Sequence, residues 1–194
     1  MKNTVVLDKV TKCYADLRVL DGISLEISEN TAIMGASGKG KTTLLRIIAG
    51  LESADSGNVL FSQKQKISMV FQEDRLFEDF GAVENITAVI GRGKENEQRA
   101  CDMLSSLLID VTEHSGAVRE FSGGMKRRVA IARALLADHN ILLLDEPLKG
   151  LDEETRDKTA QVIRRYSEEK LVLLVTHDPR EADLLGIERV VTIE

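Results

Sequence analysis

The sequence has few cysteines and no long hydrophobic run. Its two cysteines, Cys13 and Cys101, match neither metal-ligand spacing nor a disulfide framework, so we interpret both as reduced thiols. The longest apolar runs, 141–144 and 171–175, fall far short of the roughly 20 residues that a membrane-spanning helix needs. Residues 1–10 show no apolar stretch behind a basic end, and a signal peptide is therefore not expected.

Positive charge is not in excess. Lysine and arginine number 26 against 32 acidic residues, which gives a net charge of -6. A general attraction to nucleic acid or anionic lipid is therefore not expected, and any phosphate ligand must be held by a local site. A hydrophobic content of 43% with 30% charged residues is typical of a globular protein, and 194 residues suit one domain.

The hydrophobic spacing predicts strands that alternate with helices. The predicted strands are 5–10, 23–27, 31–34, 59–61, 67–71, 141–144, 171–175 and 190–193. The predicted helices are 42–51, 125–137 and 153–169, with a short one before the last strand and helical spacing from 84 to about 108 that is interrupted at 91–97. Strand–helix–strand repeats with apolar strands favour an α/β fold, with a mostly parallel sheet covered on both faces.

A glycine-rich loop lies between the strand predicted at 31–34 and the helix predicted at 42–51. Its backbone N–H groups could curl around phosphate oxygens, with the helix dipole directed at the same anion. Lys41 would contact the outer phosphates, and the Thr42 hydroxyl would ligate Mg²⁺. An ordinary glycine-rich turn is the alternative, which this strand-to-helix placement disfavours. Residues 35–42 fit the P-loop pattern, which has four residues between its outer glycines and ends in Lys-Ser or Lys-Thr. The predicted phosphate site comprises Gly35, Ala36, Ser37, Gly38, Lys39, Gly40, Lys41, Thr42 and Thr43.

Two carboxylates follow the buried strand predicted at 141–144. The carboxyl end of a strand is where an open α/β sheet places its ligand-binding groups. Asp145 is expected to hold Mg²⁺, directly or through water, and Glu146 to polarise the attacking water as a general base. A solvated acidic strand end is the alternative, and the P-loop upstream disfavours it.

A serine and two glycines open the helix predicted at 125–137. Ser122, Gly123 and Gly124 together offer a hydroxyl, backbone amides and a helix dipole to an anion. On these residues alone, an ordinary helix cap is the simpler interpretation.

The order of these motifs resembles that of the ATP-binding cassette (ABC) ATPase family over essentially the whole chain. The motifs are the P-loop, Gln72 at a strand end, Ser122-Gly123-Gly124, Asp145-Glu146, Asp152 and His177. The resemblance implies a P-loop NTPase with a RecA-like core, an antiparallel β subdomain and a helical subdomain. We expect a single nucleotide-binding domain over 1–194, with the core and β lobe at about 1–72 and 138–194 and the helical lobe at about 73–137.

The resemblance also implies a role for three residues outside the P-loop and the acidic pair. Tyr14 would stack on adenine, Gln72 would sense or bind Mg²⁺ and the attacking water, and His177 would contact the γ-phosphate. Taken singly, each has an ordinary alternative as a strand aromatic, a surface polar residue or a helix cap.

One P-loop and one Ser-Gly-Gly signature in a chain imply a head-to-tail homodimer in this family. Ser122 and Gly124 would contact the γ-phosphate of a nucleotide bound to the partner subunit, and Asp152 would lie in the loop that crosses the interface. Two chains would then form two composite ATP sites, and ATP binding would shift the population toward the closed dimer.

The chain departs from the family pattern at several positions. Met125 replaces the usual final glutamine of the signature, as in importer-like members, Phe121 stands where leucine is typical, and Arg127 replaces a common glutamine. Segments 28–31 and 56–68 look shorter than the family norm.

The segment after Gln72 indicates what the ATPase would drive. In the family this region receives a helix of the membrane permease, and Leu76, Phe77 and Phe80 are apolar among charges. Packing inside the helical lobe is the alternative. The run 73–76 followed by Glu84-Asn85 most resembles the ATPases of nitrate, sulfonate, taurine and thiamine-precursor importers.

The resemblance therefore implies the ATP-hydrolysing subunit of an importer, bound to the inner face of the cytoplasmic membrane through a separate permease. A solute-binding protein is expected as a further partner, and nucleic acid is not. A soluble ABC ATPase is the alternative. A role in repair is disfavoured because the sequence has no coiled-coil insertion or zinc-ligand cysteines, and a role in translation because it has one cassette. The signature and the acidic pair argue against a P-loop kinase.

Overall fold

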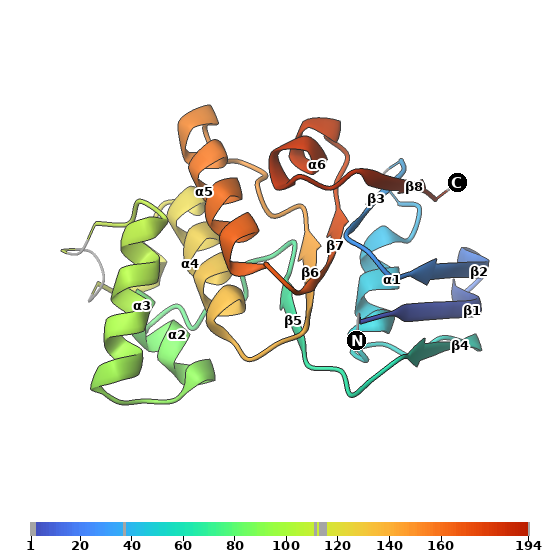
Figure 1. Ribbon diagram of the computed structural model, residues 1–194, viewed down its shortest axis with the longest axis horizontal. Helices are drawn as coiled ribbons and strands as arrows, with labels where there is room; N and C mark the ends of the chain where they lie inside the picture. Colours follow the sequence, from blue (N-terminus) through green and yellow to red (C-terminus); the bar gives the residue numbers. More distant parts are fainter. Residues whose placement is uncertain (1–2, 37, 111, 113–115, 194) are drawn as a thin grey trace. The chain divides into compact units, whose positions relative to one another are not determined.

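The chain divides into two units, each assembled from segments that are distant in the sequence. In the computed structural model, residues 3–36, 38–110, 112 and 116–193 are described. The first unit comprises Met1–Met69, His139–Glu146 and Glu169–Glu194, and the second comprises Val70–Asp138 and Pro147–Glu168. We describe the elements of each in turn (Figure 1).

An antiparallel sheet forms one part of the first unit. Its strands are β1 (Val5–Tyr14), β2 (Leu17–Ile27) and β4 (Ser56–Phe61), in the order β2-β1-β4. Strands β1 and β2 are longer than the hydrophobic pattern predicts, because residues 12–14 also pair with residues 17–20 across the hairpin. Exposed strand ends do not need apolar side chains, since backbone hydrogen bonds hold them.

The other sheet has the order β5-β6-β7-β3-β8. Its strands are β3 (Thr31–Met34), β5 (Ile67–Val70), β6 (Ile141–Asp145), β7 (Leu171–Val175) and β8 (Arg189–Thr192). The pairs β6–β7, β7–β3 and β3–β8 are parallel, which confirms the predicted parallel sheet. Every residue of β6 and β7 is buried, as the uninterrupted apolar runs require of strands covered on both faces.

Helix α1 (Lys41–Ile48) joins the two sheets of the first unit into one core. Four of its residues are buried in a cluster with side chains from both sheets: Leu44, Leu45, Ile47 and Ile48. Burying one such side chain stabilises the fold by about 1.5–3 kcal/mol. The helix that follows the glycine-rich loop is therefore held from two sides. The short helix α6 (Pro179–Leu185) completes this unit.

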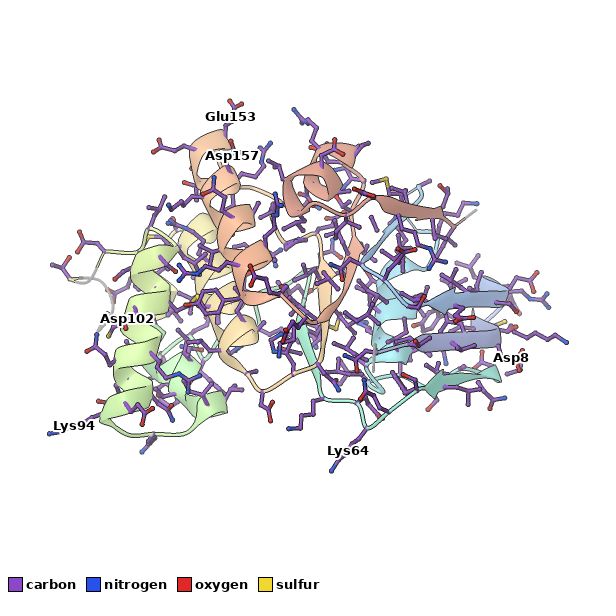
Figure 2. All side chains as sticks on the ribbon, in the orientation of Figure 1. Asp8, Lys64, Lys94, Asp102, Glu153 and Asp157 are labelled. Carbon is purple, nitrogen blue, oxygen red and sulfur yellow. The ribbon has the colours of Figure 1, made fainter. Side chains whose placement is uncertain are left out.

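The second unit is helical. It contains α2 (Ala82–Ile90), α3 (Lys94–Ser106), a 3₁₀ turn at Val118–Glu120, α4 (Gly123–Leu136) and α5 (Glu153–Tyr166). Helix α4 contacts α2, α3 and α5. Charged side chains such as Lys94 and Asp102 on α3 project away from the helix in Figure 2, while Met103 is fully buried. The contacts with three other helices place α4 at the centre of the helical unit, and the amphipathic pattern of α3 buries its apolar side.

The predicted interruption at 91–97 is wrong in extent. Helix α2 ends at Ile90 and α3 begins at Lys94, so only 91–93 are outside a helix. The polar residues after Gly93 suit a helix start, because acidic side chains in the first turn complement the helix dipole. The Asn96 side chain also donates to the carbonyls of Ile90 and Gly91 and closes the turn.

Candidate functional site

The glycine-rich loop connects β3 to α1. Lys41, the first residue of α1, is 8% exposed, and its ammonium donates to the carbonyls of Gly35 and Ala36 at 2.8 Å each. Gly40 caps the helix in a left-handed conformation with φ of 79°. The loop therefore curls around the Lys41 ammonium beside the unpaired first N–H groups of a helix, which is an arrangement that binds anions. Ser37 of the predicted site lies outside the described residues.

The register of the parallel sheet aligns three strand ends at this edge. Ile33 of β3 pairs with Val175 of β7, and Val175 pairs with Asp145 of β6. The residues that follow these positions are the glycine-rich loop, the turn that contains His177, and Glu146. Because parallel strands present their carboxyl ends at one edge, the sheet brings these three predicted segments to the same edge within one unit.

Glu146 and His177 are joined directly. Glu146 Oε1 lies 2.8 Å from His177 Nδ1, and the two side chains are 15% and 63% exposed. The Glu146 backbone has a φ of 48°, which is uncommon for a residue with a side chain, and its N–H donates to the carbonyl of Val175. This backbone turn and the histidine orient a carboxylate that can accept a proton.

A second carboxyl, which the sequence analysis did not single out, lies behind the His177 turn. Glu181 is 6% exposed, and burial raises its pKa, while the hydroxyl of the buried Thr176 acts in the opposite direction. Glu146 also contributes a smaller upward shift to this pKa. A glutamate in the first turn of a short helix is usually an exposed partner of the helix dipole, so the sequence carried no signal of this burial.

Tyr14 ends strand β1 with 44% of its surface exposed. Its hydroxyl donates a short hydrogen bond to Glu52, and the Lys12 ammonium lies 5.6 Å from the ring centroid. Lys12 is itself paired with Asp55 at 3.0 Å. The ring is therefore held at its hydroxyl by Glu52 and over one face by Lys12, and its exposed surface remains open to a planar ligand.

The second unit holds the other predicted residues. Ser122 is exposed at the N-cap of α4, where its Oγ accepts from the N–H of Met125 at 3.3 Å, and Gly123 and Gly124 form the first turn. Asp152 caps α5 by accepting from the N–H of Thr155 at 3.0 Å, and this hydrogen bond lowers the pKa of Asp152. Both positions present a helix start, with backbone N–H groups available to an anion.

The loop that contains Gln72 is held by side chains that the sequence analysis did not predict. Gln72 is exposed, and its backbone carbonyl accepts from Arg127 Nη2 at 2.7 Å. Further along, the fully buried Asn85 accepts from the N–H of Phe77 at 2.8 Å and donates to the carbonyls of Phe77 and Gly81. These contacts depend on the tertiary fold, so neither the spacing nor the composition indicates them.

The oxygen ligands in the first unit suit a magnesium ion. The Thr42 hydroxyl and the Asp145 carboxylate are hard oxygen donors, and Asp145 is 1% exposed. Mg²⁺ is usually bound by one or two such protein groups together with waters and substrate phosphates. Among the described residues, no group of three or more histidine, cysteine, aspartate or glutamate side chains is placed to hold a metal.

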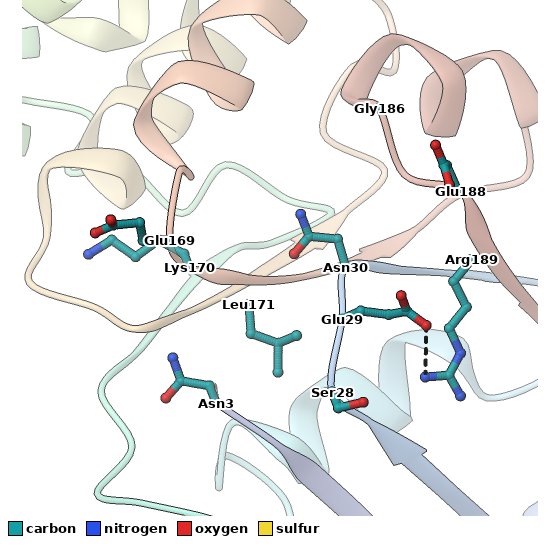
Figure 3. Close-up of a pocket in the computed structure, with 10 residues that line it drawn as sticks. All are labelled: Asn3, Ser28, Glu29, Asn30, Glu169, Lys170, Leu171, Gly186, Glu188 and Arg189. Atoms are coloured by element: carbon teal, nitrogen blue, oxygen red, sulfur yellow. Dashed lines mark ion pairs between the residues drawn. The ribbon is translucent and has the colours of Figure 1, made fainter. Parts of the chain in front are cut away.

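A separate hollow of about 590 Å³ lies at the amino ends of β3, β7 and β8 (Figure 3). Figure 3 shows Glu29 and Arg189 on one side, joined by an ion pair of 4.0 Å, and Glu169 beside Lys170 on the other. Leu171 lies between them. The residues that line this hollow include none of those predicted for the nucleotide site.

These features define a P-loop nucleotide-binding protein: a glycine-rich loop between a parallel strand and a helix, with carboxylates at the end of a neighbouring strand. A family model described as "ABC transporter" matches residues 20–149. The chain is 31% identical to a solved dimeric ATP-binding cassette bound to ADP and phosphate, with a TM-score of 0.88 over 98% of this chain and 94% of that one. The chain belongs to the ABC transporter family, and its fold is that of an ABC ATPase cassette.

Curated relatives are named as import proteins. The chain is 40% identical to an aliphatic sulfonates import ATP-binding protein of Xanthomonas axonopodis pv. citri, over 95% of this chain and 66% of the relative. It is 37% identical to a sulfate/thiosulfate import ATP-binding protein of Xylella fastidiosa, over 91% of this chain and 56% of the relative. The chain thus spans between about half and two thirds of these relatives. None of the helices among the described residues has the length and apolarity to cross a membrane.

Proposed function

We propose that this chain binds ATP with Mg²⁺ and hydrolyses it, as the energising subunit of an ABC importer. The observation that carries the proposal is the shared sheet edge in the first unit, where β6, β7 and β3 end in register before Glu146, His177 and the Lys41 loop. Lys41 would contact the outer phosphates, and Thr42 and Asp145 would hold Mg²⁺, which when bound neutralises phosphate charge.

The geometry supports a hydrolytic step. A water molecule attacks the γ-phosphorus, the bond to the bridging oxygen of ADP breaks, and Glu146 accepts the proton that the water loses. His177, hydrogen-bonded to Glu146, has a largely exposed side chain that can also contact the γ-phosphate. Gln72 would position the attacking water and Mg²⁺. Tyr14 would supply the exposed ring for adenine.

A dimer of this chain completes the proposed site. Ser122 and the glycines that follow it present a capped helix start, and Asp152 presents another, both within the second unit. In the head-to-tail arrangement implied by the family, each would face the nucleotide of the partner copy. The dimeric state of the solved ATP-binding cassette that this chain resembles supports the proposal.

Transport would be coupled through a separate permease, which would hold the chain on the inner face of the cytoplasmic membrane. The import function named for the two relatives supports this role. Phe77 and Phe80 offer the docking surface: their rings are 54% and 46% exposed, with centroids 5.7 Å apart. Asn85 holds the backbone beneath them. A solute-binding protein would select the cargo.

The substitution Glu146→Gln tests the hydrolytic role. Glutamine keeps the shape of the side chain but cannot take the proton, so phosphate release should fall about 10²- to 10⁴-fold. ATP affinity, measured by equilibrium binding, should stay within a few-fold of the original chain. Turnover close to that of the unmodified chain would remove Glu146 as the base.

Membrane fractionation tests the transport role. The tagged chain should sediment with native membranes and co-purify with an integral membrane protein identified by mass spectrometry. Replacing Phe77 and Phe80 by aspartate should release the chain to the soluble fraction while leaving ATP binding intact. A chain that is soluble at its native level, with no membrane protein attached, would favour the soluble ABC ATPase instead.

A further inference from the structure

A buried arginine interrupts the apolar face of α4. Arg127 is 6% exposed and lies one and two turns before the buried residues Ile131 and Leu135. A guanidinium keeps its charge at any physiological pH, so burying it is costly unless its donors and its charge are all matched. Its partners in the structure therefore show why the position tolerates arginine.

Among the residues that the structure describes, the Arg127 side chain bonds to the loop that contains Gln72. Nη1 donates to the carbonyl of Phe71 at 2.5 Å, and Nη2 donates to the carbonyl of Gln72 at 2.7 Å. The charge is matched by Asp74, whose Oδ1 lies 3.2 Å from Nη1. The two nitrogens of one planar group thus hold two successive carbonyls, which fixes the peptide planes on both sides of Gln72.

Arg133, which lies further along α4, bonds to the same segment. Its Nη2 donates to the carbonyl of Asp74 at 3.1 Å, and its Nη1 donates to the carbonyl of Arg75 at 2.9 Å. Four of the five carbonyls in segment 71–75 are therefore held by two side chains of one helix. An irregular segment has no regular hydrogen-bond ladder of its own, so these donors determine its conformation.

We propose that Arg127 is a positioning residue that sets the direction of Gln72 and ties it to the signature helix. Ser122 caps α4 and Arg127 lies five residues later, so one rigid helix carries both the signature and the group that holds the Gln72 backbone. If the signature moves when nucleotide binds, the same helix would then move Gln72 with it. The proposal rests on the proposed function, because Gln72 matters only if this site handles ATP.

Neither of the obvious replacements can reproduce these contacts. Lysine would bring a charge for Asp74, but its single nitrogen would have to replace two nitrogens that the planar guanidinium holds a fixed distance apart. Glutamine, the residue common at this position in the family, has one NH₂ group and no charge. Arg127→Lys should therefore retain part of the effect, and Arg127→Gln should lose it.

The test compares Arg127→Gln and Arg127→Lys with the unmodified chain by hydrogen exchange and by turnover. In Arg127→Gln, exchange at the amides of 72–76 should rise about tenfold or more, the size expected for loss of one charge-assisted hydrogen bond. Turnover should fall by a similar factor, with ATP affinity nearly unchanged, because Gln72 acts on water and Mg²⁺. Arg99→Gln, on an exposed face of α3, is the control for removal of one positive charge.

A double variant separates positioning from loss of stability. Arg127→Gln leaves the Asp74 carboxylate without its nearest cation, and adding Asp74→Asn removes that defect. The double variant should regain thermal stability but not turnover or exchange protection. Recovery of turnover, or unchanged exchange in Arg127→Gln, would overturn the proposal. If the unmodified chain neither binds nor hydrolyses ATP, the proposed function fails, while the exchange result still reports whether Arg127 holds the loop.

Discussion

Replacing glycines of the phosphate loop by alanine separates the conformational role of the loop from its ligand role. Gly38 and Gly40 have nearly equal φ angles of 81° and 79°, but their surroundings differ. A Cβ on Gly38 meets nothing within 4 Å, whereas one on Gly40 would lie 2.7 Å from the carbonyl oxygen of Val19 and 2.7 Å from Leu20 Cδ2. Both substitutions therefore place an alanine in a left-handed conformation, but only Gly40→Ala also creates steric clashes.

The expected magnitudes follow from these distances. An L-residue in the left-handed region costs about 1–2 kcal/mol, so Gly38→Ala should lower the free energy of unfolding by that amount. Gly40→Ala adds the displacement of a backbone oxygen and a core side chain, about 1–3 kcal/mol more, for a total of about 2–5 kcal/mol. Gly50→Ala, with φ of 69° and open space around it, is the control outside the loop.

Urea unfolding and equilibrium ATP binding measure the two effects on the same samples. Gly38→Ala and Gly50→Ala should shift the unfolding midpoint equally, but only Gly38→Ala should weaken ATP binding, because its methyl group stands where phosphate oxygens approach the backbone. If Gly40→Ala is no more destabilised than Gly50→Ala, the packing described around the start of α1 is wrong. If Gly38→Ala binds ATP normally, the loop is not the phosphate site.

Substitutions at three further positions test other parts of the site. Ser122→Ala should cost about 1 kcal/mol of stability through loss of the α4 cap, and about 10²-fold or more in turnover if the serine contacts phosphate. Burial raises the pKa of Glu181 above its value in the unfolded chain. The contribution of the protonated carboxyl to stability is therefore complete at low pH and is lost as the pH rises through the raised pKa. Glu181→Gln should reduce the fall in melting temperature between pH 5 and pH 8. Tyr14→Phe should keep ATP affinity, whereas Tyr14→Ala should weaken it about tenfold, since stacking needs the ring and not the hydroxyl.

Each of these has a clear contrary result. If the turnover of Ser122→Ala falls no further than the loss of about 1 kcal/mol of stability explains, the serine acts only as a helix cap. A pH dependence of melting that Glu181→Gln leaves unchanged would mean that the buried carboxyl does not titrate differently on unfolding. Normal affinity in Tyr14→Ala would place adenine elsewhere.

The sequence predicted elements best where burial is complete. The limits of β3 and β7 agree with the predicted 31–34 and 171–175, because these runs are short, wholly apolar and bounded by polar residues. The ends of β1 and β2 were missed because exposed hairpin strands need no apolar pattern. The start of α3 was missed because Glu95 and the polar residues around it were interpreted as a break, although acidic residues also favour the first turn of a helix.

For the site, the motifs identified the residue types, but the contacts between them required the fold. The left-handed backbone of Glu146 and its bond to His177 join residues that are 31 positions apart, and no local pattern encodes them. Arg127 was noted only as a departure from the family. A charged residue within the apolar stripe of a helix is a detectable signal, yet its partners in segment 71–75 lie more than fifty positions away.

The central claim is that ATP is hydrolysed at a site shared between two copies of this chain. The most direct test is the rate of phosphate release per chain, measured with Mg²⁺-ATP over a range of protein concentrations, with the oligomeric state determined in the same samples by light scattering. The account predicts that the rate per chain rises with concentration as dimers form, and that an excess of Ser122→Ala chains suppresses it. A rate per chain that stays constant down to monomeric protein would contradict the shared site.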